Sequence, residues 1–168
     1  FIEYKPSETR GRCYVNDASK TLALISATGR RNLGVTMDFG HSVYGDGNPA
    51  EELSLIQYAG VPYYIHINDN DGRWDWDFFC GSHHMLSYIE FLFYLRHYGY
   101  DDYLTSDTSP TRWDINKTFE ANSNITRRIE MMLDRIGDET ILEFLRGNDY
   151  TATWEMIQSE IFGLPNLV

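Results

Sequence analysis

The feature that most constrains this chain is a regular alternation of short apolar runs with longer helical patterns. Four short runs, "FIEY", "LGVTMD", "VPYYIHIN" and "DYLTSD", are each followed by at least one segment with helical character. Strands that alternate with helices in this way pair in parallel, with a helix crossing over between neighbours. The sequence therefore predicts an α/β fold on a parallel sheet, followed by extra C-terminal helices.

Residues that begin and end helices support this division. Asp17 can cap a helix through "ASKTLALISATG", which Gly29 ends. Pro49 is suited to the first turn of "PAEELSLIQYAG", which Gly60 ends, and the apolar helix "MLSYIEFLFYLRHYG" stops at Gly99. Further helices are predicted around "NSNITRRIEMMLDRIG", "ETILEFLRG" and "TATWEMIQSEIFG".

Two architectures satisfy this order of elements, a doubly wound sheet and part of a (β/α)8 barrel. A complete barrel takes about 250 residues. The 168 residues contain four βα units, which is half of a barrel. In either architecture the short, almost uninterrupted apolar strands are expected to be covered on both faces.

Charge and cysteine content exclude several classes of partner. The net charge of -11 argues against binding to a phosphate backbone, and no apolar run approaches the length of a membrane span. We therefore expect neither a nucleic-acid nor a membrane partner. Cys13 and Cys80 form no disulfide framework, which suggests a reducing compartment and a cytoplasmic location.

Metal-ligand residue types follow each of the four strands. Glu3, Asp38, His66 and Asp107 occur once per strand, at its carboxyl end. In parallel α/β folds the carboxyl ends of the strands form the ligand-binding edge, so these side chains are expected to meet in one pocket. Any single one of them is more simply explained as a helix cap or turn residue. Four consecutive strands that end in the same way favour a cation site.

Three further side chains lie slightly beyond the strand ends. His41, Asp75 and Asp77 are placed to hold a second cation. A ligand set rich in carboxylates with a few imidazoles suits Mn²⁺, Mg²⁺ or Co²⁺, and two divalent cations would allow so many acids to share one site.

The acidic stretch "HINDNDGRWDWD" contains residues with other expected roles. Asn68, like Glu8 near the first strand, is a candidate to orient ligands. Residues 69–71 are expected to form a solvated turn. Trp74 and Trp76 either wall the pocket or anchor the loop. His83 and His84, just before a helix, are expected at the surface or behind the ligands.

Taken in order, "IEYKPSETRG", "GVTMDFGHS", "IHINDNDGRWDWD" and "SDTSPTRWD" resemble consecutive strand-end motifs of the xylose isomerase family, over about residues 1–135. Two positions depart from that family, which usually has Glu where this chain has Asp38, and Asp where it has His66. The complete ligand set is more similar to that of L-rhamnose isomerases in the same superfamily.

The resemblance implies that residues 1–168 form a single but incomplete TIM-barrel domain, with strands five to eight of the barrel and a helical extension at residues 136–168. The partner it implies is the N-terminal half of the barrel, and the oligomer it implies is a tetramer. A half-barrel with two open sheet edges is expected to associate.

The resemblance also implies an activity, the interconversion of an aldose and a ketose by hydrogen transfer between C1 and C2 of a monosaccharide. Glu3, Asp38, His66 and Asp107 would hold one cation, and His41, Asp75 and Asp77 the catalytic one. Lys5 would donate a hydrogen bond to O1, so that Lys5, Asp75 and His41 are the candidate catalytic residues. The alternatives are a single-metal sugar epimerase, an endonuclease IV-like barrel enzyme, and a non-catalytic barrel fragment.

Overall fold

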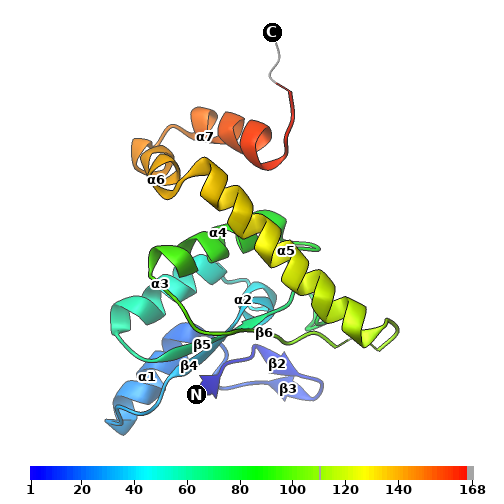
Figure 1. The fold of residues 1–168 in the computed structure, drawn as a ribbon. Helices are drawn as coiled ribbons and strands as arrows, with labels where there is room; N and C mark the ends of the chain where they lie inside the picture. Colours follow the sequence, from blue (N-terminus) through cyan, green and yellow to red (C-terminus); the bar gives the residue numbers. More distant parts are fainter. Residues whose placement is uncertain (110, 166–168) are drawn as a thin grey trace. The chain divides into compact units, whose positions relative to one another are not determined.

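The structure is a computed structural model that describes residues 1–109 and 111–165. The chain divides into two compact units, residues 1–126 and residues 127–168. Figure 1 shows the course of the chain through its strands and helices. The first unit contains every strand in the described part of the chain, and the second consists of helices.

The first unit is built on a four-stranded sheet with the strand order β1-β4-β5-β6. Its strands are β1 (Ile2–Glu3), β4 (Val35–Asp38), β5 (Tyr63–Ile67) and β6 (Leu104–Ser106). All neighbouring pairs are parallel, which confirms the predicted α/β fold. The spatial order follows the chain order without the reversal of a doubly wound sheet, as in the wall of a half-barrel.

Three helices connect the strands, and their ends confirm the predicted caps. They are α1 (Ala18–Thr28), α3 (Pro49–Ala59) and α4 (Met85–His97). The Asp17 carboxylate accepts a hydrogen bond from Lys20 N at 2.7 Å, and so satisfies a backbone donor in the first turn of α1. Gly29 and Gly60 end α1 and α3 at φ values of 63° and 66°, a left-handed conformation that glycine adopts without strain.

The two faces of the sheet differ in chemistry. Met37 and Ile65 are paired between β4 and β5, and both are fully buried. Helices α3 and α4 lie on one side of the sheet (Figure 1), and both contribute apolar side chains to the core, including Leu53, Ile56, Phe91 and Leu92. The next pair in register, Asp38 and His66, points to the opposite face because side chains alternate along a strand. The apolar core and the polar candidate site therefore lie on opposite faces of the same strands.

The expectation that every strand is covered on both faces is wrong for β1, β5 and β6, and β5 shows this most clearly. Ile65 and Ile67 are buried, whereas the residues that alternate with them, Tyr64 and His66, are only half-buried. Strand β4 does match the expectation, since all four of its residues are buried. The difference arises because residues of β5 on the polar face line the candidate site.

Two short elements were not predicted from the sequence. Strands β2 (Ser7–Glu8) and β3 (Gly11–Arg12) form an antiparallel hairpin directly after β1. Helix α2 (Phe39–Tyr44) begins immediately after β4. Strands of two residues are too short to show an apolar-polar period, and a six-residue helix is too short to show a helical one.

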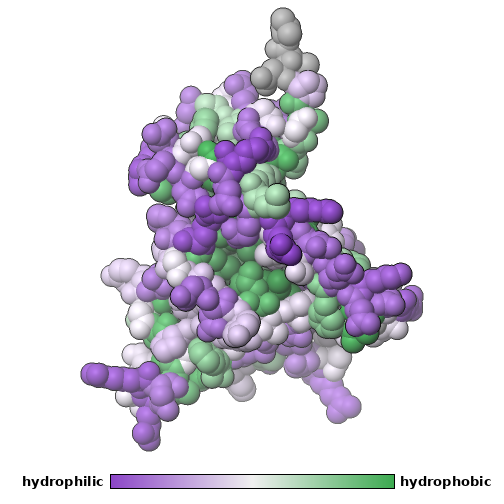
Figure 2. Space-filling model, in the orientation of Figure 1, coloured by the Kyte–Doolittle hydropathy of each residue, from purple (hydrophilic) through white to green (hydrophobic). Residues whose placement is uncertain are grey.

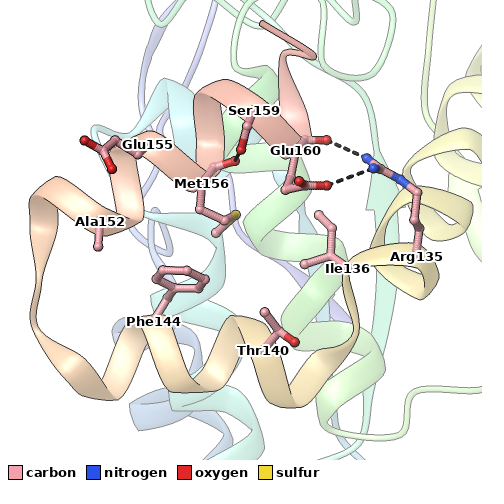
Figure 3. Close-up of a pocket in the computed structure, with 9 residues that line it drawn as sticks. All are labelled: Arg135, Ile136, Thr140, Phe144, Ala152, Glu155, Met156, Ser159 and Glu160. Atoms are coloured by element: carbon pink, nitrogen blue, oxygen red, sulfur yellow. Dashed lines mark hydrogen bonds and ion pairs between the residues drawn. The ribbon is translucent and has the colours of Figure 1, made fainter. Parts of the chain in front are cut away.

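The second unit continues the predicted C-terminal helices. Helix α5 (Ile115–Ile136) begins in the first unit and is followed by α6 (Asp138–Gly147), α7 (Tyr150–Met156) and a π-helical turn at Ile157–Ile161. A pocket of about 520 Å³ lies among these helices (Figure 3). Beside it, Arg135 donates to the Glu160 carboxylate at 2.8 Å and to the Glu160 carbonyl at 2.7 Å.

The surface in Figure 2 is coloured by hydropathy. Hydrophilic residues cover most of the face shown in Figure 2, with apolar residues in smaller areas. Among the residues that the structure describes, no helix is both long enough and apolar enough to span a membrane.

The cap of α1 gives a test of the fold. We expect Asp17→Ala to lower the free energy of unfolding by about 1 kcal/mol, because Lys20 N loses its acceptor. Urea denaturation followed by circular dichroism measures this change. Ser19→Ala, at an exposed position of the same helix, is the control and should change stability by less than about 0.5 kcal/mol. Equal stabilities for the two variants would contradict the assigned cap.

Candidate metal centre

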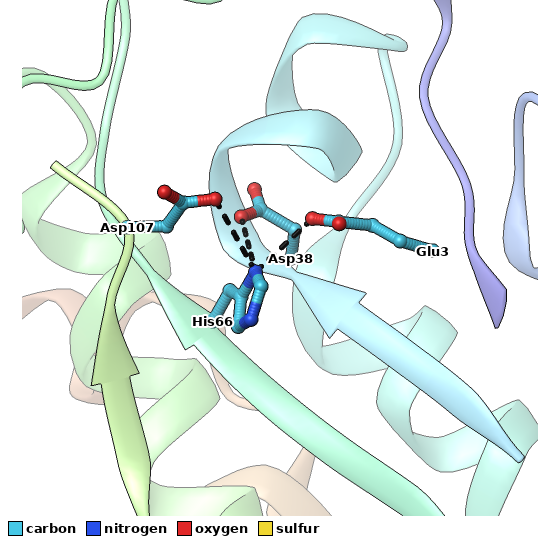
Figure 4. A group of neighbouring side chains, drawn as sticks. All are labelled: Glu3, Asp38, His66 and Asp107. Carbon is cyan, nitrogen blue, oxygen red and sulfur yellow. Dashed lines mark hydrogen bonds and ion pairs between the residues drawn. The ribbon is translucent and has the colours of Figure 1, made fainter. Parts of the chain in front are cut away.

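The four residues that end the parallel strands come together at one point. Each of them offers one ligand atom, and these four atoms all lie within 4.8 Å of one another. Figure 4 shows that their side chains converge from neighbouring strands: Glu3, Asp38, His66 and Asp107. This arrangement follows from the parallel register, which pairs Glu3 with Thr36 and Asp38 with His66.

His66 lies at the centre of this group. Its Nδ1 atom is 3.1 Å from a Glu3 oxygen, 3.3 Å from an Asp107 oxygen and 3.7 Å from an Asp38 oxygen. Hydrogen bonds to Asp107 and Glu3 raise the pKa of His66 to about 10, despite the opposing effect of burial. The negative charges of three carboxylates therefore act on one atom.

Asp38 is the most rigidly held of the four. Its side chain is fully buried, and its Oδ1 accepts a hydrogen bond from His41 N at 2.8 Å, which also caps helix α2. Its Oδ2 accepts from Asn68 Nδ2 at 2.8 Å. Burial raises the pKa of Asp38 to about 6, and the charges of Glu3 and Asp75 add to this effect. Asn68, predicted to orient ligands, thus donates to one oxygen of Asp38, and its role toward a cation stays a prediction.

The second predicted ligand group lies beside the first in a different arrangement. Asp75 Oδ2 is 2.7 Å from Lys5 Nζ and 3.2 Å from His41 Nε2, so one oxygen links both. Burial alone would raise the pKa of Asp75, but the hydrogen bonds from His41 and Lys5 lower it to about 2. His41 Nδ1 is 3.5 Å from Glu3 Oε1, which connects the two groups.

Asp77 faces the same region without a bond to His41 or Lys5 in the described part of the chain. Its backbone is left-handed, with φ at 51°. Burial, followed by the charges of Asp75 and Asp107, raises its pKa to about 7. Among the residues that the structure describes, the strand-end group is the one whose ligand atoms converge closely, whereas His41, Asp75 and Asp77 do not form such a group.

A cleft of about 600 Å³ opens onto both groups. Its polar wall contains Lys5 and five of the seven predicted ligands: Glu3, His41, Asp75, Asp77 and Asp107. Cys13 and Tyr14, which follow the β2-β3 hairpin, also line the cleft. Most of the predicted ligands therefore line one open, strongly acidic cavity that also contains a lysine, whereas Asp38 and His66 are not among its lining residues.

The stretch from His66 to Asp77 differs from its prediction in the middle. Asp69 and Asn70, expected in a solvated turn, are fully buried. Asp69 Oδ2 accepts hydrogen bonds from His83 N at 2.8 Å and His84 N at 3.0 Å, and its Oδ1 is 2.8 Å from His84 Nδ1. This carboxylate therefore fastens the two ends of the loop that carries Asp75 and Asp77. The prediction of a solvated turn was wrong. Composition alone cannot show that the Asp69 carboxylate has hydrogen-bond donors fourteen and fifteen residues later in the chain.

The remaining predicted residues have visible contacts. Trp74 packs edge-on against Tyr44, and Trp76 stacks on Phe78 while its Nε1 donates to Asp71 at 3.0 Å. These contacts are those of loop anchors, and neither tryptophan lines the described part of the cleft. Glu8, which is largely exposed, lies 3.4 Å from Lys5 Nζ and lines the cleft.

Gly40 was not identified from the sequence, although its small size is required here. A β-carbon at Gly40 would lie 1.8 Å from Asn68 Oδ1. The Gly40 carbonyl also accepts a hydrogen bond from Asn70 Nδ2 at 2.7 Å. The glycine in "DFGHS" thus allows Asn68 to reach Asp38.

The donor set fits a divalent cation. Carboxylate oxygens with one imidazole suit Mg²⁺, Mn²⁺ or Co²⁺. The three acids of the group raise the pKa of the single His66 ring, whose one positive charge would offset them only in part, so the cluster favours further positive charge at its centre. The buried Nδ1 of His41 and Oδ1 of Asp75 have no hydrogen-bond partner among the described residues, which leaves ligand atoms available beside the first group.

Comparisons with known proteins agree with the fold of the first unit. Residues 2–134 match the family described as xylose isomerase-like TIM barrel. The chain is also 25% identical over 123 residues to the uncharacterized protein MJ1311 of Methanocaldococcus jannaschii. That match covers 73% of this chain and 40% of the relative, so the chain spans well under two thirds of the relative's length.

The close contact at Gly40 gives a prediction for the site. We expect Gly40→Ala to lower the free energy of unfolding by about 1–3 kcal/mol, because the added methyl group must displace the buried Asn68. Urea denaturation measures the loss. Gly11→Ala is the matched control, since a β-carbon there meets nothing within 4 Å. A Gly40→Ala protein as stable as Gly11→Ala would show that the packing around Asp38 is looser than described.

Proposed function

This chain belongs to the xylose isomerase-like TIM barrel family, and we propose that it acts as a divalent-metal-dependent sugar isomerase that interconverts an aldose and a ketose. The family includes sugar isomerases, epimerases and endonuclease IV enzymes, so membership alone does not select the reaction. The observation that supports the proposal is the convergence of Glu3, Asp38, His66 and Asp107 beside a lysine in an open cleft.

In this proposal the strand-end group holds one cation, and His41, Asp75 and Asp77 hold a second. Mn²⁺, Mg²⁺ or Co²⁺ would suit both donor sets. Bound there, such ions supply Lewis acidity to the oxygens of the substrate. Asp38 brings its two oxygens to the site already fixed by Asn68 and His41 N, so it needs little reorganisation to act as a ligand.

Lys5 supplies a fixed positive charge in the cleft. Burial alone would lower its pKa, but the hydrogen bond and charge of Asp75 raise it above the usual lysine value, so the ammonium group stays protonated. An ammonium donor aimed at a substrate oxygen stabilises negative charge that develops on that oxygen during hydrogen transfer between C1 and C2. Asp75 holds Lys5 and His41 at 2.7 Å and 3.2 Å and so fixes both relative to the substrate.

The charge of the cleft favours a neutral polyhydroxylated substrate. Most of the titratable groups that line it are acids, and the whole chain carries a net charge of -11. A sugar offers hydroxyl donors to the carboxylates of the cleft. The acidic charge of the whole chain opposes binding of a polyanionic duplex, which disfavours the endonuclease alternative.

A single-metal sugar epimerase is the second candidate, and one observation favours it. The strand-end group converges, whereas Asp75 is already engaged by Lys5 and His41. If this engagement persists when a cation binds, Asp75 serves as an orienting acceptor and the site holds one ion. Metal stoichiometry therefore separates the two candidates.

Cation binding by the strand-end group is the first functional prediction. We expect saturating Mn²⁺ to stabilise the purified chain, by about 2.7 kcal/mol at a concentration 100 times the Kd. We expect Asp38→Asn to weaken Mn²⁺ binding more than about tenfold, because it removes a ligand charge. Urea denaturation with and without Mn²⁺ measures the stabilisation, and isothermal titration calorimetry measures the Kd. Glu120→Gln, which changes an exposed acid on α5, should bind as the parent chain does.

Absence of any Mn²⁺, Mg²⁺ or Co²⁺ binding by the parent chain would refute the metal-dependent function. Loss of binding in Glu120→Gln as well as in Asp38→Asn would show instead that binding depends on overall charge.

Asp75→Ala separates isomerase from epimerase. For the two-cation isomerase we expect the parent chain to bind two equivalents of Mn²⁺, and Asp75→Ala to bind one and to lose aldose-ketose interconversion. Calorimetric stoichiometry and a chromatographic assay on a panel of aldoses measure these outcomes. If the parent chain and Asp75→Ala each bind one equivalent of Mn²⁺, and Asp75→Ala still turns over a sugar, the single-metal epimerase is favoured.

A further inference from the structure

A buried amide on helix α5 contacts the residues on both sides of Asp107. The Asn122 side chain is almost fully buried, and its Nδ2 donates to Ser106 Oγ and to Thr108 Oγ1, each at 2.7 Å. These two hydroxyl groups also lie 3.0 Å from each other. Asn122, which follows Ser106 by sixteen residues and Thr108 by fourteen, therefore holds both neighbours of the candidate ligand Asp107.

The directions of three consecutive side chains at the end of β6 give this contact a consequence. The hydroxyl groups of Ser106 and Thr108 both point toward Asn122, and the Asp107 side chain between them points to the other face of the chain. On that other face its Oδ2 lies 3.3 Å from His66 Nδ1. Holding the two neighbours toward α5 thus directs the Asp107 carboxylate toward the strand-end group.

Asp107 depends on this indirect support more than Asp38 does. Both Asp38 oxygens accept hydrogen bonds from other groups of the chain. The Asp107 side chain is half-exposed, and among the described residues its carboxylate contacts His66 without a comparable amide or backbone donor. Its position is therefore fixed mainly through the backbone. Asp107 N donates a hydrogen bond to Ile67 O at 3.1 Å, and Asn122 donates to the side chains of the two neighbouring residues.

The same amide also reaches the loop that carries Asp75 and Asp77. Asn122 Oδ1 accepts a hydrogen bond from Cys80 N at 3.0 Å, three residues beyond Asp77. The three hydrogen bonds use both donors and the acceptor of one amide. Asn122 is thus a single buried point that links α5, the end of β6 and the acidic loop.

We infer that Asn122 is a positioning residue of the cation site, which acts through Asp107 and the acidic loop without contacting the ion. The inference rests on the proposed function, because it concerns the affinity of that site for a divalent cation. Supporting residues that orient metal ligands commonly contribute about tenfold or more to metal affinity.

Mn²⁺ binding to the purified chain tests the inference. We expect Asn122→Leu, which keeps a similar volume and removes all three hydrogen bonds, to raise the Kd for Mn²⁺ about tenfold or more. Thr126→Val is the matched control: Thr126 is buried on the same helix and bonds to the Asn122 carbonyl and Tyr88 OH instead. It should lower the melting temperature and leave the Kd unchanged.

The Asp107→Ala background shows whether the effect passes through Asp107. In that background we compare the Kd of the protein with Leu at position 122 with the Kd of the protein that keeps Asn122. The ratio of these two Kd values should be smaller than in the parent chain, because only the contribution of the acidic loop remains. The double variant Ser106→Ala, Thr108→Val removes the two acceptors without changing Asn122, and should weaken Mn²⁺ binding even if Asn122→Leu does not fold.

An unchanged Kd in a folded Asn122→Leu protein, or in the double variant when Asn122→Leu does not fold, would overturn the inference and leave the proposed function intact. An undiminished Kd ratio in the Asp107→Ala background would also overturn it. A parent chain that takes up no Mn²⁺ would refute the proposed function and the inference together.

Discussion

The interaction on which the rest of the site depends is the crowding of three carboxylates around one imidazole nitrogen. Glu3, Asp107 and Asp38 oxygens lie 3.1, 3.3 and 3.7 Å from His66 Nδ1. Acids this close together, one of them fully buried, repel one another unless positive charge lies between them. The raised pKa of His66 favours a protonated ring that supplies part of that charge, and a divalent cation in place of the proton would supply more.

The parallel sheet makes this crowding possible. Each strand contributes one side chain at its carboxyl end, and the register places the polar side chains on one face while Met37 and Ile65 pack on the other. The chain thus separates its stabilising apolar contacts from its charged cluster by the thickness of one sheet. Around the cluster, Asn68, Asp69 and Asn122 are buried polar groups whose hydrogen bonds hold the strand ends and the acidic loop.

Much of this arrangement could be predicted from the sequence because it follows from local rules. Asp17 and Gly29 mark the ends of α1, and the alternation of strands and helices gave the parallel sheet. The place of Glu3, Asp38, His66 and Asp107 at strand ends followed from the same alternation, so their meeting at one point was a topological consequence. Their roles as metal ligands stay predictions.

The supporting residues could not be predicted because their partners are distant in the chain. Asp69 lies in a run of Asp and Asn typical of a turn, yet its partners are His83 N and His84 N. Gly40 looks like an ordinary loop glycine until Asn68 is placed against it. Asn122 lies on a polar helix segment, and only the fold brings Ser106, Thr108 and Cys80 N to it.

The most direct test of the central claim is an anomalous difference map at the manganese absorption edge, from crystals of this chain grown with Mn²⁺. We predict a peak in contact with Glu3, Asp38, His66 and Asp107 together. A map in which manganese binds elsewhere, while the three carboxylates remain gathered around His66 with no ion among them, would contradict the account.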